Sequence, residues 1–234
     1  MEPSGGSLQN CRMAESGFKK MRKVKFETGE YYHIYNRGVD KREIFGDEKD
    51  YVRFLRSMRE FNRKQNIGSL FAFEKARESH PVASEPPGGL VRLIAYCLNP
   101  NHYHFLLEQK VDNGISKYMH KLMMGYSQYF NKKFKRSGCL FQGKFKSVAV
   151  SSDWQLSYAS AYINGNAEIH GIAKAESYQW SSYPDYLGKR AGALCDKKII
   201  LKEFDSVGDY RKYANETIKN SRQIKEELKK YSLE

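Results

Sequence analysis

Short strand-like segments alternate with amphipathic helical segments along this chain, and their order limits the folds open to it. Residues 31–35 predict a strand that ends at a turn signal, and residues 90–98 and 102–108 predict two strands joined by an Asn-Pro-Asn turn. Residues 145–150 predict a further strand. With helices between them, the order is β, α, β, β, α, β, α. This order favours an α+β domain whose antiparallel sheet carries helices on one face.

Apolar side chains recur at helical spacing in the segments between the strands. Asp47 is typical of an N-cap and begins a helix, while residues 115–130 and 154–166 predict two more helices. A Lys- and Glu-rich helix from residue 210 to 230 carries few apolar side chains. We therefore expect that last helix to dock loosely.

The predicted elements divide the chain into three parts. Residues 1–22 predict a flexible basic arm, residues 23–190 the main domain, and residues 191–234 a C-terminal helical extension. Within the main domain, residues 75–89 are rich in Pro and Gly and predict an inserted loop. We expect this loop to top a hairpin whose first strand includes residues 70–73.

Charge and hydropathy exclude several classes of protein. The chain has 40 Lys and Arg against 27 Asp and Glu, a net charge of +13 that favours a nucleic-acid partner. Its 40% hydrophobic content excludes collagen-like, disordered and disulfide-scaffold proteins. The longest apolar stretch, residues 93–98, is far shorter than the roughly 20 residues of a membrane span. No secretory signal is recognisable, and the cysteines lie singly, so we expect a cytoplasmic protein with no membrane partner and no zinc ribbon.

His102 and His104 are the sharpest candidates for chemistry. Side chains two residues apart in a strand point to the same face, so both imidazoles are presented together over the sheet. Two neighbouring neutral imidazoles form half of a divalent-metal site. The same spacing also arises by chance, and two imidazoles can merely hydrogen-bond. The spacing alone leaves both interpretations open.

Tyr162 and Asn166 form a second candidate pair. Four residues apart on a predicted helix, their side chains project from one face. An amide oxygen is a ligand that suits magnesium or manganese. As a nucleophile, however, Tyr162 has no local advantage over Tyr126, Tyr129 or Tyr158.

Residues 131–146 carry six basic side chains, no acidic one, and interleaved phenylalanines. Positive charge attracts phosphates, and aromatic faces stack on bases, although these phenylalanines also suit a core. We predict DNA contacts from the basic side chains Lys132, Lys133, Lys135, Arg136, Lys144 and Lys146.

Five longer blocks follow one another in the chain: YHIYNRG (32–38), LNPNHYHFLL (98–107), GCLFQGKFKS (138–147), YINGN (162–166) and WSSY (180–183). In the same order, they resemble blocks of the single-tyrosine HUH transposases, in particular the REP-associated tyrosine transposases of bacteria. The resemblance covers residues 25–188, so that residues 23–190 are predicted to be the catalytic domain.

The resemblance implies a ferredoxin-like or RRM-like antiparallel sheet. It also implies that His102 and His104, with Asn166 as a candidate third ligand, bind Mg²⁺ or Mn²⁺, and that Tyr162 is the nucleophile. Arg37 and Gln142 lie within two of the blocks and join the predicted DNA-binding residues.

Three positions depart from the family's usual pattern. Ala167 stands where Pro is usual, Lys144 where Arg is usual, and Asn99 where Met is common. Lys144 keeps the charge but loses the bidentate fork of an arginine. None of the three removes a chemical group that the reaction requires.

The activity implied by the resemblance is that of a single-stranded DNA transposase. Such an enzyme cleaves and rejoins hairpin-bearing DNA, such as a REP-like palindrome, through a 5′-phosphotyrosine intermediate. We expect it to be nucleoid-associated in the cytoplasm, as a monomer or a homodimer. Two alternatives remain open: a catalytically silent nucleic-acid-binding regulator of the same fold, and a metal-dependent phosphodiesterase that uses water.

Overall fold

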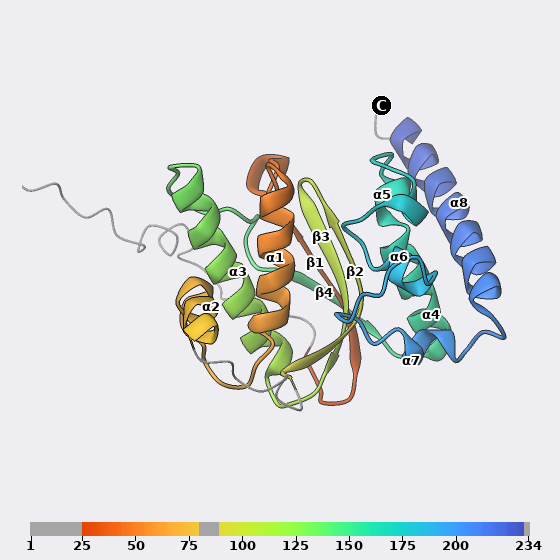
Figure 1. Cartoon of the computed structure of the whole chain (residues 1–234). Coiled ribbons are helices and arrows are strands. Elements are labelled where there is room, and N and C mark those ends of the chain that lie inside the picture. Colours follow the sequence, from red (N-terminus) through yellow and green to blue (C-terminus); the bar gives the residue numbers. More distant parts are fainter. Residues whose placement is uncertain (1–24, 80–88, 232–234) are drawn as a thin grey trace, which may run out of the picture.

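A computed structural model describes residues 25–79 and 89–231 and contains one four-stranded antiparallel sheet (Figure 1). Its strands are β1 (Tyr31–Arg37), β2 (Val91–Asn99), β3 (His102–Gln109) and β4 (Lys146–Val150). They lie in the order β2-β3-β1-β4. The predicted α+β class is confirmed, whereas the predicted arm of residues 1–22 lies outside the described residues.

Helices lie between and after these strands in the described residues. The longer ones are α1 (Glu48–Glu60), α2 (Leu70–Ser79), α3 (Gly114–Lys133), α4 (Asp153–Asn164) and α8 (Val207–Tyr231). The shorter ones are η2 (Val39–Lys41), α5 (Asn166–Ile169), η3 (Ala175–Ser177), α6 (Tyr183–Tyr186) and α7 (Lys198–Leu201).

The first face of the sheet is closed by α1 and α3, which lie on the left in Figure 1. Alternate strand residues such as Ile34 and Phe105 are fully buried against Phe54 of α1 and Leu122 of α3. Asp47 caps α1 as predicted, since its side chain accepts a hydrogen bond from the Asp50 N–H at 3.1 Å. Burial of each such large apolar side chain stabilises the fold by about 1.5–3 kcal/mol.

The second face is covered only in part. Helix α4 packs on β2 and β3, and α5 packs on β2, over the small side chains Ala95 and Cys97. The expectation of helices on one face therefore holds for α1 and α3 and is corrected by α4 and α5. Toward β4 the second face is open, because Lys146 and Val148 are exposed.

Helix α8 is docked more tightly than its composition suggested. Tyr210, Ala214 and Ile218 are buried against α4 and α5, and the Tyr210 hydroxyl accepts a hydrogen bond from Asn164 Nδ2 at 2.8 Å. A Cβ at Gly165 would lie 2.2 Å from Ile218, so this close approach requires glycine. The prediction of loose docking was wrong because the few apolar residues share one face. The boundary at residue 190 remains a prediction.

Residues 70–73 are helical and not a strand, so the predicted hairpin around residues 75–89 is wrong. Ser69 Oγ accepts a hydrogen bond from the Ala72 N–H at 3.1 Å and starts α2, which continues to Ser79. The strand that follows, β2, pairs with β3 instead. A run of four apolar residues is too short to separate strand from helix. Residues 80–88 of the predicted loop lie outside the described residues.

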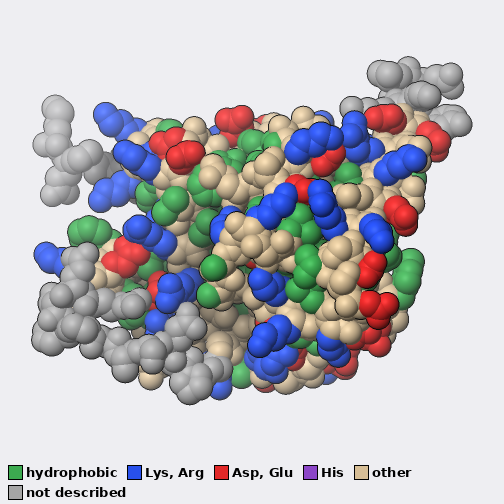
Figure 2. Space-filling model, turned by 45° about the vertical axis from the view of Figure 1, so that its right-hand side comes forward, with side chains coloured by type: hydrophobic (Ala, Val, Ile, Leu, Met, Phe, Trp, Pro, Cys, Tyr) green, Lys and Arg blue, Asp and Glu red, His purple; other side chains and the backbone are tan. Residues whose placement is uncertain are grey.

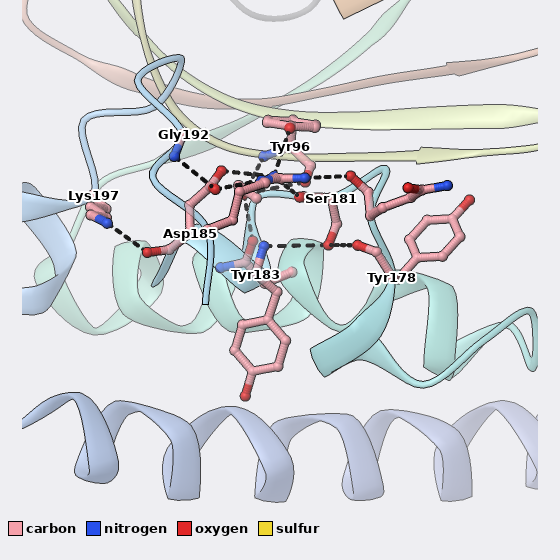
Figure 3. A network of polar contacts seen from close by, with 11 residues as sticks. Tyr96, Tyr178, Ser181, Tyr183, Asp185, Gly192 and Lys197 are labelled. Atoms are coloured by element: carbon pink, nitrogen blue, oxygen red, sulfur yellow. Dashed lines mark hydrogen bonds and ion pairs between the residues drawn. The ribbon is translucent and has the colours of Figure 1, made fainter. Parts of the chain in front are cut away.

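The segment after α5 covers the outer edge of β2. Leu98 N–H donates to the Trp180 carbonyl at 2.9 Å, and Asp196 N–H donates to the Leu93 carbonyl at 2.8 Å. The Asp185 carboxylate holds this segment: it accepts hydrogen bonds from Arg190 Nε at 2.6 Å and from the Gly192 N–H at 3.2 Å. Figure 3 shows Asp185 and Gly192 within this network of polar contacts. The edge strand is thereby protected from further pairing.

A chain of buried hydrogen bonds fixes α4 on the sheet. Ser182 Oγ accepts from the Tyr96 N–H of β2 at 2.9 Å and donates to Asn164 Oδ1 at 2.6 Å. Asn164 in turn donates to Tyr210 of α8. These bonds hold the end of α4 that carries Tyr162.

The surface in Figure 2 carries more Lys and Arg than Asp and Glu across its middle, in keeping with the net charge of +13. Within residues 25–79 and 89–231, no helix combines the length and the apolar character needed to cross a membrane.

Candidate functional site

A pocket of about 360 Å³ lies where the second face of the sheet meets α4. It brings together most of the predicted chemistry, from segments that lie more than a hundred residues apart in the chain. Its lining residues are Tyr35, Asn36, Arg37, Lys41, Asn101, His102, His104, Gln142, Lys146, Tyr162 and His170.

The two histidines enter the pocket from β3. His104 is opposite Tyr35 of β1, and its Nδ1 lies 2.8 Å from Nε2 of His33. His102 Nδ1 lies 2.6 Å from Asn101 Oδ1. Each ring thus uses Nδ1 for a neighbour, which is how metal-binding histidines are commonly oriented, with Nε2 toward the metal.

His102 and Asn166 converge from β3 and α5. His102 Nε2 lies 3.2 Å from Asn166 Oδ1, and Asn99 Nδ2 lies within 2.8 Å of the former and 2.6 Å of the latter. Asn166 Nδ2 is buried and has no hydrogen-bond partner among the described residues. The departure at Asn99 therefore places an amide directly between two predicted ligands.

These residues fit a divalent metal. Neighbouring ligand atoms around an octahedral ion at about 2.1 Å are separated by about 3 Å, close to the 3.2 Å between His102 Nε2 and Asn166 Oδ1. Asn99 Nδ2 contacts both atoms, so this amide would have to turn away before an ion could bind. Burial lowers the pKa of His102, an effect that the Asn166 hydrogen bond partly offsets, and lowers the pKa of His104 well below its usual value. Both imidazoles are therefore neutral near pH 7, which is the ligating form.

The ligand set depends on the amide. In the part of the chain that the structure describes, no group of three or more His, Cys, Asp or Glu side chains is arranged to hold a metal ion. A site built from His102 and His104 would therefore be completed by the neutral oxygen of Asn166.

Tyr162 faces the histidines from α4. Its ring centroid lies 6.0 Å from that of His104 and 6.1 Å from that of His33. Burial raises the pKa of the phenol, and the neighbouring Asn166 side chain partly offsets this effect. The predicted helix of residues 154–166 is interrupted at Gly165, yet α5 continues closely enough to keep Asn166 beside Tyr162.

The pocket contains only some of the predicted DNA-binding residues. Arg37 Nε donates a hydrogen bond to Gln142 Oε1, and both side chains line the pocket together with Lys146. The other predicted DNA-binding residues, which are not part of the lining, are Lys132, Lys133, Lys135, Arg136 and Lys144.

Lys133 is engaged elsewhere. Its Nζ lies 2.6 Å from Asp50 Oδ1 and 2.9 Å from Asp47 Oδ1, which ties α3 to the start of α1. These hydrogen bonds raise the pKa of Lys133 despite its partial burial. The Asp50 carboxylate is fully buried, so the ammonium of Lys133 neutralises a charge of the fold.

The sequence analysis did not assign a site role to His33, which lies beside His104, or to the pocket-lining residues Tyr35, Asn36, Lys41, Asn101 and His170. His33 shares the face of Tyr35 on β1, and strand alternation would have placed it beside His104. Lys41 belongs to η2, and His170 follows α5, with its ring centroid 4.7 Å from that of His102. No local pattern marks Lys41 or His170.

A family model matches the segment of the chain that carries much of this site. Residues 89–166 match the model of the family described as "Transposase IS200 like", which confirms the resemblance over that segment. The match supports a transposase function and, with it, a DNA-cleaving activity. No curated protein matches the chain.

One solved structure found in the comparison is that of a REP-associated tyrosine transposase bound to a REP hairpin. It has 14% sequence identity and a TM-score of 0.49 and covers 74% of this chain and 92% of the other chain.

Proposed function

We propose that this protein is a metal-dependent transposase that cleaves and rejoins single-stranded, hairpin-bearing DNA through Tyr162. The observation that carries the proposal is the single pocket that unites Tyr162, His102 and His104 with positive charge. The family match supports it, because residues 89–166 include both histidines, Tyr162 and Asn166. An enzyme acting on chromosomal DNA would work at the nucleoid in the cytoplasm.

His102, His104 and Asn166 are the residues that would hold Mg²⁺ or Mn²⁺. When bound there, the cation would neutralise charge on the scissile phosphate and polarise its P–O bonds. The chain itself contributes orientation, because His33 and Asn101 fix the two rings and α5 fixes the amide.

Tyr162 is proposed to act as the nucleophile. Its Oη loses a proton and forms a bond to phosphorus, the P–O3′ bond breaks, and O3′ takes up a proton and leaves as a 3′-hydroxyl. The product is a 5′-phosphotyrosine ester, which keeps the phosphoester bond for the rejoining step. Because burial raises the pKa of Tyr162, its deprotonation depends on the positive charge around the pocket, which Arg37, Lys41 and Lys146 supply.

Positive side chains around the pocket are proposed to bind phosphates. Arg37, oriented by Gln142, and Lys41 and Lys146 line the pocket directly. We assign the exposed Lys132, Lys135 and Lys144, and the partly buried Arg136, to phosphates of the DNA farther from the cleaved bond.

The test is a denaturing gel of the protein incubated with 5′- or 3′-labelled hairpin DNA and Mn²⁺. A covalent protein–DNA band together with a free 3′-hydroxyl fragment is the expected result. Cleavage without any protein adduct would instead favour the water-using phosphodiesterase. Binding without cleavage would favour the catalytically silent regulator.

A further inference from the structure

An exposed apolar strip runs along α4 and β4. The exposed fractions are 67% for Trp154, 38% for Tyr158 and 51% for Val148. Exposed single apolar residues are ordinary, but these three belong to two elements that pack against each other. A largely exposed tryptophan in such a group indicates a surface that binds another molecule.

The rings of the strip are aligned with the nucleophile. Trp154, Tyr158 and Tyr162 follow one another at intervals of four residues along one side of α4. The ring centroids of Trp154 and Tyr158 are 5.6 Å apart with planes at 15°, and those of Tyr158 and Tyr162 are 6.4 Å apart at 18°. The aromatic strip therefore leads from the surface into the pocket.

Positive charge borders the strip on the sheet side. Val148 and Lys146 lie two residues apart on β4 and point to the same face, opposite His33 and Tyr35 of β1. Lys146 also lines the pocket. An apolar stacking surface beside a cation matches a strand of bases linked by phosphates better than it matches an apolar protein surface.

We propose that Trp154 and Tyr158 of α4, together with Val148 of β4, bind unpaired bases of the DNA strand adjacent to the bond cut by Tyr162. The proposal rests on the proposed function and names the part of the substrate that this surface grips. Every base has a stacking face, so the strip would bind single-stranded DNA with little sequence preference. It would contribute to the binding of a single-stranded flank and nothing to the binding of a blunt hairpin.

The first test uses the fluorescence of the protein itself. The chain has two tryptophans, and Trp180 is partly buried and stacked on Tyr51 at 4.4 Å. Titration of Tyr162→Phe protein with a 16-nucleotide oligothymidylate should quench the Trp154 emission, and the quench should disappear in Trp154→Phe, Tyr162→Phe protein. If the Trp154 emission of the Tyr162→Phe protein is unchanged at saturating DNA, the proposal is wrong.

The second test compares two DNAs and three variants. Trp154→Ala and Tyr158→Ala should each bind a hairpin with a single-stranded flank about tenfold more weakly and a blunt hairpin unchanged. Phe71→Ala is the control, because Phe71 of α2 is 74% exposed and outside the strip. Equal weakening for both DNAs, or none, would contradict the assignment.

Sedimentation of the same proteins separates the proposal from self-association. If Trp154→Ala turns a dimer into a monomer and binds flanked DNA normally, the strip is an interface between copies and the proposal fails. The covalent-adduct gel tests the proposed function separately. If wild-type protein forms no adduct although DNA quenches the Trp154 emission, the proposed chemistry is wrong and the proposed role of the strip in DNA binding is retained.

Discussion

Strand β3 sends Tyr103 and Phe105 to one face of the sheet and His102 and His104 to the other. On the first face, α1 and α3 close over fully buried aromatic side chains. On the second face, α4 covers β2 and β3 but leaves a pocket and an open surface beside β4. One strand thus serves the core with one set of residues and the candidate site with the alternate set.

The difference between the two faces explains how a basic sheet protein can keep a reactive surface. The first face supplies the apolar burial that stabilises the fold, so the second face can hold polar groups. Those polar groups are held by specific partners, as in the His33–His104 and Asn99–Asn166 contacts. A polar cluster of this kind needs partners, because an unsatisfied buried polar group costs about 1–3 kcal/mol.

The largest expected effect is on the rate of adduct formation, and it comes from a substitution on the second face. Tyr162→Phe removes one oxygen and keeps the ring, so the protein should fold and bind DNA as before. Formation of the covalent adduct should fall at least about 1,000-fold, because the group that attacks phosphorus is gone. The rate is measured from the denaturing gel.

Tyr158→Phe, one turn earlier on α4, is the matched control: it loses only the hydroxyl and keeps the ring that stacks on a base, so it should keep the adduct. Peptide mapping of the trapped complex identifies the modified residue. Label on Tyr158, Tyr126 or Tyr129 would show that Tyr162 is not the nucleophile.

Replacement of both His102 and His104 by Ala should abolish metal-dependent cleavage. Most of the DNA affinity should remain, because phosphate contacts supply much of it. Cleavage and filter-binding assays measure the two effects, and His120→Ala, an exposed histidine of α3, is the control. Metal-dependent cleavage by the double variant would show that His102 and His104 are not the metal ligands.

On the first face, the expected effect is on stability. Phe105→Ala should lower the free energy of unfolding by about 3–5 kcal/mol, because it opens a cavity in a closed aromatic core. Trp154→Ala on the open side should lower it by less than about 1 kcal/mol. Urea unfolding of both variants checks this difference, and equal losses would mean that the strip on α4 is part of the core.

The smallest expected effect separates two kinds of lysine. Replacing Lys144 and Lys146 with Gln should lower the salt-dependence slope of single-strand binding by about 0.7 per lost phosphate contact. Lys133→Gln should leave that slope unchanged and lower the free energy of unfolding by about 1–3 kcal/mol, because it leaves the Asp50 carboxylate buried without its cation. A reduced slope for Lys133→Gln would place it on the DNA.

Local periodicity was sufficient for much of this site. The period of two in β3 placed His102 and His104 on one face, and the spacing of four placed Tyr162 near Asn166 despite the break at Gly165. Asp47 was identified as an N-cap from its position alone. These features depend on backbone geometry within a few residues, which a sequence displays directly.

Other features depended on contacts between distant segments. Lys133 and Lys146 look alike in the basic run, yet one neutralises Asp50 of α1 and the other lines the pocket. His170 and Lys41 reach the pocket from segments that carry no motif. The sparse apolar residues of α8 predicted loose docking, whereas Tyr210 is buried and hydrogen-bonded to Asn164.

The four strands and most of the long helices could be predicted from the sequence, as could the side chains that share a face, because these follow from the repeat of the backbone; residues 70–73, which are helical, are the exception. Only the tertiary structure decided which charges are spent on the fold and which remain at the pocket. That choice depends on the packing of α1 against α3 and of α8 against α4, which joins residues far apart in the chain. Burial and pairing then fix the state of each charge, since desolvation and ion pairing act through space and not along the chain.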